Sequence, residues 1–261
     1  MKKYIYLLTL IVHFLAFCQK ETVKITNSIT KNADSFIGTD GFGNYFFMKG
    51  SVFHKKSENL DLQYTNFALG TPSKIDIINP LKIVLFYEIF NTAILLDSQL
   101  NEIQKIDFSK TETAIIANSV GLSSSNNLWV FNNINQQLLL YNMPSSNLKN
   151  IGNIFRETPI FYQSNFNYFY WINNQNELFS ISIFGSIIPF GKIKLGDNYQ
   201  IINDEKIIIY SNNEFFLYDF HTKLEHKLNI VEKSFKNFYY KDQILSIFTN
   251  EEIINYKIII P

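Results

Sequence analysis

The side chains that could hold a metal ion are few and scattered along the sequence. The chain has four histidines and one cysteine, and only His221 and His226 lie close together, around the segment FHTKLEH. A structural zinc site needs about four converging ligands, and two neighbouring histidines do not supply them. We therefore interpret His54, His221 and His226 as solvated turn residues and predict no metal site and no cofactor.

The segment TDGFGN, residues 39–44, resembles a calcium- or phosphate-binding loop in part. It lacks the alternating Asp and Asn ligands and the distant Glu of an EF-hand loop. Gly41 and Gly43 adopt positive φ angles at low cost, so we favour a turn between two strands.

Signatures of nucleophilic catalysis are also missing. No Gly-x-Ser-x-Gly elbow occurs, and the run Ser123–Ser125 has no histidine beside it. The charged runs at 204–206 and Glu251–Glu252 are typical of solvated turns. The sequence therefore predicts no enzyme activity.

Composition indicates a strand-rich globular protein. The chain has 261 residues, of which 46% are hydrophobic, with 25 Phe, 15 Tyr and 2 Trp. Such residues favour strands. The 23 basic and 23 acidic side chains balance, which argues against nucleic acid as a partner, because nucleic-acid binders usually carry a basic patch.

The first eighteen residues have the pattern of a secretory signal peptide. Lys2 and Lys3 precede the apolar run YIYLLTLIVHFLAF, and the small residues Ala16 and Cys18 occupy the two positions that a signal peptidase reads. An N-terminal anchor helix is the alternative. Cys18 is either removed with the signal or lipidated, and we favour removal because Phe17 is large for a lipobox. We expect an exported protein in the periplasm, at the outer membrane or outside the cell, which contacts a membrane only if Cys18 carries lipid.

A repeat of about forty residues dominates the rest of the chain. Six segments share an apolar strand, a polar turn and a second apolar strand, and the first strands are spaced by 38, 45, 41, 38 and 38 residues. These strands centre near Phe46, Val84, Trp129, Tyr170, Ile208 and Ser246. Such a period is typical of solenoids and propellers.

Each repeat predicts four antiparallel strands, which we call a to d. A shorter apolar stretch precedes the hairpin, and an alternating stretch follows it in the first five repeats. Four short strands per forty residues indicate a β-propeller blade. The sixth repeat lacks strand d, and the orphan strand ETVKITNSI, residues 21–29, would close the ring.

We therefore predict an all-β fold, a single six-bladed β-propeller of four-stranded blades whose last blade is closed by the N-terminal strand. A signal peptide at 1–18 precedes one domain at 19–261, with blades at about 35–70, 71–110, 111–155, 156–194, 195–235 and 236–261 plus 21–29. The alternatives are an irregular β-sandwich, a curled sheet, or five or seven blades if residues 21–50 are counted differently.

Strand a of each blade would line the central channel. The predicted inner strands include FIGT, AIIA, IFYQ and FYY, and only Asp76, Gln163 and Gln200 interrupt their apolar pattern. A propeller enzyme of lactonase or glycosidase type would need converging carboxylates and amides at the channel mouth. A cluster of three or more acids or amides there would rule out the scaffold hypothesis.

The b–c turns are rich in amides. Asn tolerates left-handed backbone, so amide-rich hairpins follow from sterics alone. These turns would share one face with the d–a connections, where they could form a hydrogen-bonding rim. Our candidate rim residues are Glu88, Phe90, Asn91, Asn132, Asn133, Arg156, Glu157, Asn173, Asn174, Asn212 and Asn213.

The repeats resemble those of a known class of propellers. DGFGNYFF, residues 40–47, is similar to the Asp-x-x-Gly-x-aromatic turn of two-component-regulator propeller repeats. ILLD (94–97) and LYD (217–219) resemble the end of a propeller strand c. NPLKIVLFYEIFNT, residues 79–92, resembles uncharacterised envelope proteins of Bacteroidota. The resemblance, which extends to NHL-type repeats, implies a secreted six-bladed propeller and no activity.

Our first hypothesis is a non-catalytic secreted or envelope-attached propeller that binds an envelope or extracellular protein or polymer as a scaffold or accessory subunit. We expect a monomer or a subunit of a complex. The alternatives are a channel-mouth enzyme of lactonase or glycosidase type, or a small-molecule or glycan binder, since a fold alone does not assign function.

Overall fold

The computed structural model describes residues 23–27, 33–113, 115–230, 235–250, 252–258 and 260. The expected signal peptide, Cys18 and Glu251 lie outside these residues. Within the described ranges, no helix has the length and hydropathy needed to cross a membrane.

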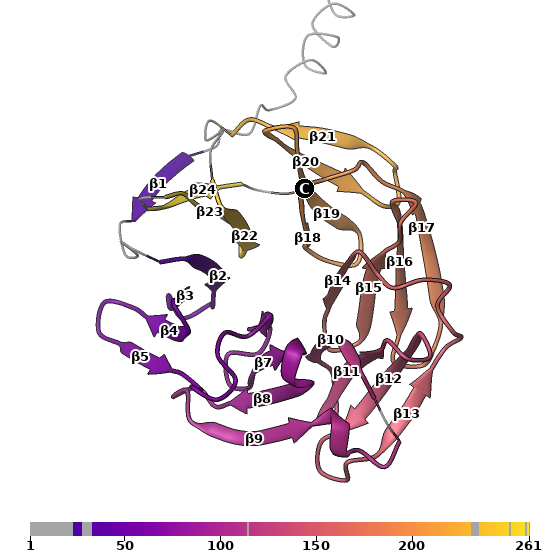
Figure 1. The fold of residues 1–261 in the computed structure, drawn as a ribbon. Coiled ribbons are helices and arrows are strands. Elements are labelled where there is room, and N and C mark those ends of the chain that lie inside the picture. The colour runs from indigo at the N-terminus through magenta and orange to yellow at the C-terminus, as the bar shows by residue number, and fades with distance from the viewer. Residues whose placement is uncertain are drawn as a thin grey trace, which may run out of the picture.

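Six four-stranded antiparallel sheets form a closed ring, which confirms the predicted propeller (Figure 1). Blade 1 holds β2 (Ser35–Thr39), β3 (Tyr45–Lys49), β4 (Val52–Lys56) and β5 (Asp61–Tyr64). Blade 2 holds β6 (Lys74–Asp76), β7 (Ile83–Tyr87), β8 (Thr92–Leu96) and β9 (Glu102–Asp107), with the short 3₁₀ helices η1 (Glu88–Phe90) and η2 (Phe108–Lys110).

Blade 3 holds β10 (Ala117–Leu122), β11 (Asn127–Asn132), β12 (Gln137–Asn142) and β13 (Leu148–Ile151). Blade 4 holds β14 (Phe161–Ser164), β15 (Tyr168–Ile172), β16 (Glu177–Ser182) and β17 (Ile187–Lys192). Blade 5 holds β18 (Asn198–Ile201), β19 (Lys206–Ser211), β20 (Glu214–Asp219) and β21 (Glu225–Leu228). Blade 6 holds β22 (Asn237–Lys241), β23 (Ile244–Phe248), β24 (Ile253–Lys257) and β1 (Val23–Asn27).

Burial follows the position of each strand in its blade. The second and third strands of blade 2, β7 and β8, are buried at every residue, because neighbouring blades cover both of their faces. The outer strands β17 and β21 are largely exposed. This difference explains why strands b and c read as continuous apolar runs in the sequence.

The hydrophobic core is divided into six clusters, and each lies between two adjacent blades. The cluster around Val84 and Val130 joins blades 2 and 3, and the cluster around Trp129 and Trp171 joins blades 3 and 4. The other four join blades 1 and 2, 4 and 5, 5 and 6, and 6 and 1. Every blade is therefore held by both of its neighbours around the whole ring.

The N-terminal strand closes the ring as predicted. β1 pairs antiparallel with β24, with Val23 opposite Lys257 and Asn27 opposite Ile253. This pairing covers the outer edge of β24, which would otherwise offer unpaired backbone groups.

One inner strand was predicted in the wrong place. The sequence suggested AIIAN, residues 114–118, as strand a of blade 3, whereas β10 runs from Ala117 to Leu122. Ile115 packs in the cluster between blades 2 and 3, and Ile116 is exposed in the connection before the strand. The two isoleucines were mistaken for a strand because the true strand, ANSVGL, is small and polar.

Candidate functional site

The channel at the centre of the ring is lined by the first strand of each blade, and its residues divide it into two chambers. The upper chamber, of about 220 Å³, lies beside the starts of the inner strands and is lined by Lys74, Asp76, Tyr162 and Tyr199, among others. The lower chamber, of about 300 Å³, lies beside their ends and reaches Asp242. Both chambers share Ile78, Gln163, Ser164, Gln200 and Tyr239.

The three polar residues singled out on the inner strands do line the channel, and each binds the backbone of the next blade. Asp76 accepts the N–H of Leu122 at 2.8 Å. The Gln163 amide donates to the carbonyl of Ile201 and accepts its N–H, at 2.7 and 2.9 Å. These bonds connect blades 2 and 3 and blades 4 and 5.

Gln200 repeats this arrangement between blades 5 and 6. Its amide donates to the carbonyl of Tyr240 at 2.8 Å and accepts the N–H of Tyr240 at 2.6 Å. One acid and two amides therefore do meet in the channel, the number that we took to rule out a scaffold. Their polar atoms hold adjacent blades together, however, so the count alone neither indicates catalysis nor rules out a scaffold.

The described part of the chain holds no cluster typical of a metal site, and the upper chamber holds no pair of carboxylates. No three His, Cys, Asp or Glu side chains there lie close enough to hold a metal ion. In the upper chamber, Asp76 is the one carboxylate among the described lining residues. A glycosidase would need two carboxyl groups facing one bond.

The candidate rim residues lie in the b–c turns and the d–a connections, on one face that we call the rim face. Asn91 sits at a φ of 48° and bonds across to blade 3: it donates to the carbonyl of Ile115 at 2.6 Å and accepts the N–H of Ala117 at 2.9 Å. The buried Asn132 accepts the N–H groups of Ile116 and Ile134. These two amides fix the backbone and are not free to bind a ligand.

The other rim residues are more exposed. Glu88 accepts a hydrogen bond from Asn118, and Asn133 accepts one from Thr158 at 3.0 Å. Asn212 and Asn213 both adopt positive φ angles, and Asn213 accepts from the Tyr210 hydroxyl. Phe90 is about half exposed. These residues lie in the turns of blades 2, 3 and 5 and do not converge on one pocket.

Three rim residues do converge. Arg156, Glu157 and Asn173 line a groove of about 590 Å³ between blades 3 and 4, together with Phe155, Trp171 and Phe179. The ring of Trp171 lies 4.4 Å from Phe155 and stacks on Phe179 at 5.1 Å. We call this the aromatic groove. Sequence reasoning found its polar residues in the turns and missed its aromatic floor, because Trp171 and Phe179 belong to strands that read as core.

The acidic side chains of the aromatic groove have hydrogen-bond partners, whereas its arginine has none among the described residues. Glu157 accepts the Asn174 side chain at 2.6 Å and its backbone N–H at 3.1 Å. Glu177 accepts from Asn173 at 2.9 Å. Among the described residues, no acceptor is paired with the Arg156 guanidinium. The groove therefore offers an unpaired cation beside a large aromatic surface.

Large apolar side chains are also exposed elsewhere on the rim face. Ile89 is 94% exposed, and Ile116 and Ile134 lie side by side, since Asn132 bonds both backbones. Asn91 links the turn that carries Ile89 to the segment around Ile116. The exposed apolar residues of this face are Phe67, Ile89, Phe90, Ile116, Ile134, Ile154, Ile160 and Leu195.

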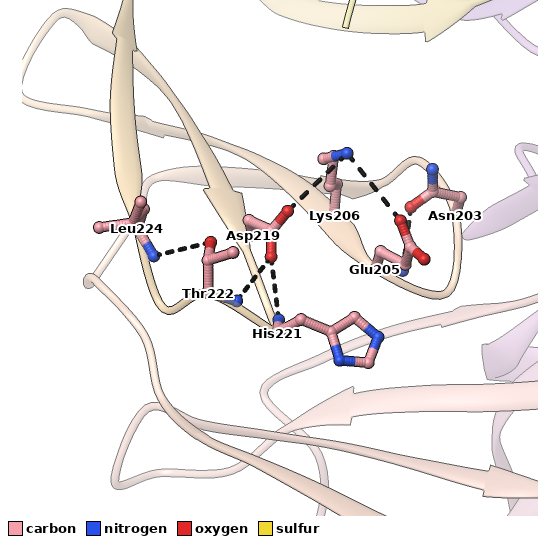
Figure 2. A network of polar contacts seen from close by, with 7 residues as sticks. All are labelled: Asn203, Glu205, Lys206, Asp219, His221, Thr222 and Leu224. Carbon is pink, nitrogen blue, oxygen red and sulfur yellow. Dashed lines mark hydrogen bonds and ion pairs between the residues drawn. The ribbon is translucent and has the colours of Figure 1, made fainter. Parts of the chain in front are cut away.

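The opposite face carries the a–b and c–d turns, where polar networks stabilise the turns themselves. Figure 2 shows one at blade 5: Asp219 accepts the N–H groups of His221 and Thr222, and Lys206 lies between Asp219 and Glu205. The His221 ring points away from this network, and both His221 and His226 are exposed. The turn at residues 39–44 is stabilised in the same way as the turn at Asp219, because Asp40 accepts the N–H groups of Phe42 and Asn44.

Comparison with known proteins shows the fold. No family model matches the chain, and no curated protein matches it. Virginiamycin B lyase from Staphylococcus aureus is similar at a TM-score of 0.61 and 10% identity, over 92% of this chain and 99% of that one. A luciferin-regenerating enzyme is similar at 0.55 and 10% identity, over 91% and 95% of the two chains.

A third similar structure is the extracellular domain of a B. thetaiotaomicron protein described as a hybrid two-component system. It has a TM-score of 0.53 and 10% identity, over 84% of this chain and 33% of that one. At such identities the likeness concerns the propeller alone, and the similar structures include enzymes and an extracellular domain of a two-component system.

Proposed function

We propose that this chain is an exported, non-catalytic propeller that docks a protein partner on its rim face, as a scaffold or accessory subunit. The observation that carries the proposal is the run of exposed apolar side chains from Ile89 through Ile116 to Ile134. Exposed apolar patches of this kind mark interaction surfaces, and a rigid ring of six blades presents them without rearrangement.

The aromatic groove supplies the anchor of the proposed interface. Energetically dominant interface residues are enriched in Trp, Tyr and Arg. Trp171 forms the floor of the groove, and the unpaired guanidinium of Arg156 lies at its edge. A partner that inserts an apolar side chain and presents a carboxylate or carbonyl to Arg156 would satisfy both features.

Export and family membership belong to the same proposal. The signal-like residues 1–18 support export, and a similar structure is an extracellular domain. The bonding of Asp40 within its turn supports the likeness to propeller repeats of the two-component-regulator and NHL type in envelope proteins of Bacteroidota.

The test compares captured partners between face-specific variants. The chain from Gln19 onward, with a C-terminal tag, is cross-linked in envelope fractions of its source cells. The variant I89D/I116D/I134D changes the rim face, and F184D/L224D is the control on the opposite face, where both residues are exposed. We expect one partner to be recovered with the wild type and the control and lost with the rim variant.

A substitution in the groove tests the anchor. We expect R156A to weaken binding of that partner by about 10-fold or more, and K149A, an exposed cation on β13, to leave it unchanged. Capture of the same partner by the rim variant would contradict the proposal. It would also be contradicted if the wild-type protein captured no partner and instead bound calcium or a sugar stoichiometrically.

A further inference from the structure

The upper chamber of the channel is a small pocket, open in part to solvent, at the rim end of the ring. Lys74, Phe161 and Tyr199 stand at or next to the first residues of β6, β14 and β18, directly after d–a connections. Its volume of about 220 Å³ lies below the range usual for drug-sized ligands. Since one water occupies about 30 Å³, the chamber has room for about seven waters or one small ligand.

The carboxylate and side-chain amide oxygens of this chamber each already accept one hydrogen bond from the backbone. Asp76 accepts the N–H groups of Leu122 and Ile78, one on each carboxylate oxygen. The carbonyl oxygens of Gln163 and Gln200 accept N–H groups from the next blades. A ligand that mainly donates hydrogen bonds would find few acceptors open.

Two hydrogen-bond donors of the chamber, by contrast, have no acceptor among the described residues. The Lys74 ammonium lies 5.1 Å from the centre of the Tyr162 ring, and no hydrogen-bond acceptor or carboxylate is paired with it among the described residues. The Tyr239 hydroxyl also has no hydrogen bond to another described residue, and its pKa is raised by burial, so it remains a donor. The chamber therefore has a surplus of donors.

Among the described residues, Lys74 forms no ion pair, although the charge of Asp76 in the same chamber acts on it. The side chain is exposed to channel solvent, and desolvation by the surrounding residues lowers its pKa while Asp76 opposes this effect. Burial in turn raises the pKa of Asp76, against the N–H groups of Leu122 and Ile78 and the charge of Lys74. Tyr162, Tyr199 and Tyr239 face the same space, with pKa values raised first by burial.

We propose that the upper chamber binds a small organic carboxylate with an apolar body. Lys74 is its ion-pair partner and Tyr239 its second donor, while Ile37, Val120 and Phe161 contact the body. Charge-assisted bonds of this type are the stronger ones in proteins. A single lysine suits a carboxylate better than a phosphate, which carries more charge and more acceptor oxygens.

This binding site is independent of the protein partner proposed for the rim face. The chamber residues lie on the inner strands, and the apolar rim residues lie in turns and connections. Either function can therefore fail in experiment without affecting the other.

The experiment is isothermal titration of the purified chain with benzoate and with benzamide, its neutral analogue of nearly equal shape. We expect benzoate to bind at a ratio of one, and benzamide at least about 10-fold more weakly, because only benzoate pairs with an ammonium. K74M keeps an unbranched side chain of similar length to the lysine stem and removes the ammonium, and it should weaken benzoate at least about 10-fold. K149M, outside the channel, is the matched control.

The hydroxyl donor is tested by Y239F, which keeps the ring in place and should weaken benzoate by about three- to ten-fold. Thermal unfolding of each variant checks that it is folded, and the comparison of benzoate with benzamide needs no variant. No binding of benzoate, equal binding of benzamide, or equal effects of K74M and K149M would each overturn the proposal.

Discussion

Amide residues occupy backbone conformations in this protein that few other residues tolerate. Asn91, Asn176, Asn212 and Asn213 have φ angles between 48° and 63°, in the left-handed region where Asn is enriched. The sequence predicted these amides as hairpin residues on steric grounds. It could not predict their bonding partners, because the bond from Asn91 to Ile115 depends on how two blades approach each other.

Asn91 should contribute more to stability than an ordinary turn residue. N91A removes its bonds to Ser109, Ile115 and Ala117 and places at a φ of 48° a residue that tolerates this left-handed conformation less well than Asn, so we expect a loss of about 2–4 kcal/mol. N91G removes the bonds but relieves the strain, and should cost about 1 kcal/mol less. Urea unfolding measures both, with N150A on the exposed strand β13 as control. Equal stability of N91A and wild type would contradict this role.

Asp219 should make the stability of the folded protein decrease as the pH falls in the acid range. Hydrogen bonds from the c–d turn, that of Thr222 first, lower its pKa below the usual 3.8. A depressed carboxyl pKa contributes stability above the unfolded value, and this contribution is lost as the pH falls through the folded value. D219N keeps an acceptor for the turn (Figure 2) but removes the titration.

We therefore expect the wild type to lose more stability than D219N between about pH 5 and pH 3. Urea unfolding of both proteins at the two pH values measures the difference. Losses of equal size would show that the turn bonds do not stabilise the charged carboxylate.

How well each strand could be predicted from the sequence depended on its position in the blade. Strands b and c are buried on both faces and were predicted correctly from their apolar runs, as β7 and β8 show. The inner strand β10 was misplaced because crowding at the channel selects small residues there. Gly121 of β10 illustrates this crowding: an added Cβ would lie 2.0 Å from the Ser164 hydroxyl oxygen and 3.3 Å from Asp76.

Gly121 should therefore be intolerant of even one added methyl group. We expect G121A to destabilise the protein by about 1–3 kcal/mol, because β10 and β14 would have to separate. S164A removes the clashing hydroxyl, so the double variant should recover part of that loss, with a coupling energy of about 1 kcal/mol. Chemical unfolding of the four proteins measures this cycle. Additive effects would contradict a direct steric contact.

For the whole molecule, closure of the ring links the two ends of the chain. The six hydrophobic clusters bind each blade to two neighbours, and the cluster at Phe36 and Phe248 joins the first blade to the last. The repeat period predicted this architecture, including the pairing of β1 with β24. The aromatic groove and the upper chamber could not be predicted in the same way, because each is formed by residues from several blades, which are distant in sequence.

Removal of the N-terminal strand should therefore weaken the whole ring. A chain that starts at Ala33 lacks β1 and exposes the edge of β24, which loses several backbone hydrogen bonds of about 1 kcal/mol each. We expect a loss of about 3 kcal/mol or more relative to the chain from Gln19, together with self-association through the open edge. Thermal unfolding and analytical ultracentrifugation measure the two effects.

The separate peptide ETVKITNSI should restore both properties when added to the shortened chain, because it can rebuild the pairing of Ile25 with Asn255. The same peptide with proline in place of Ile25 lacks one backbone donor within the strand, so it should fail. A shortened chain that stays monomeric and as stable as the longer one would mean that β1 is dispensable, and that the inter-blade clusters alone hold the ring closed.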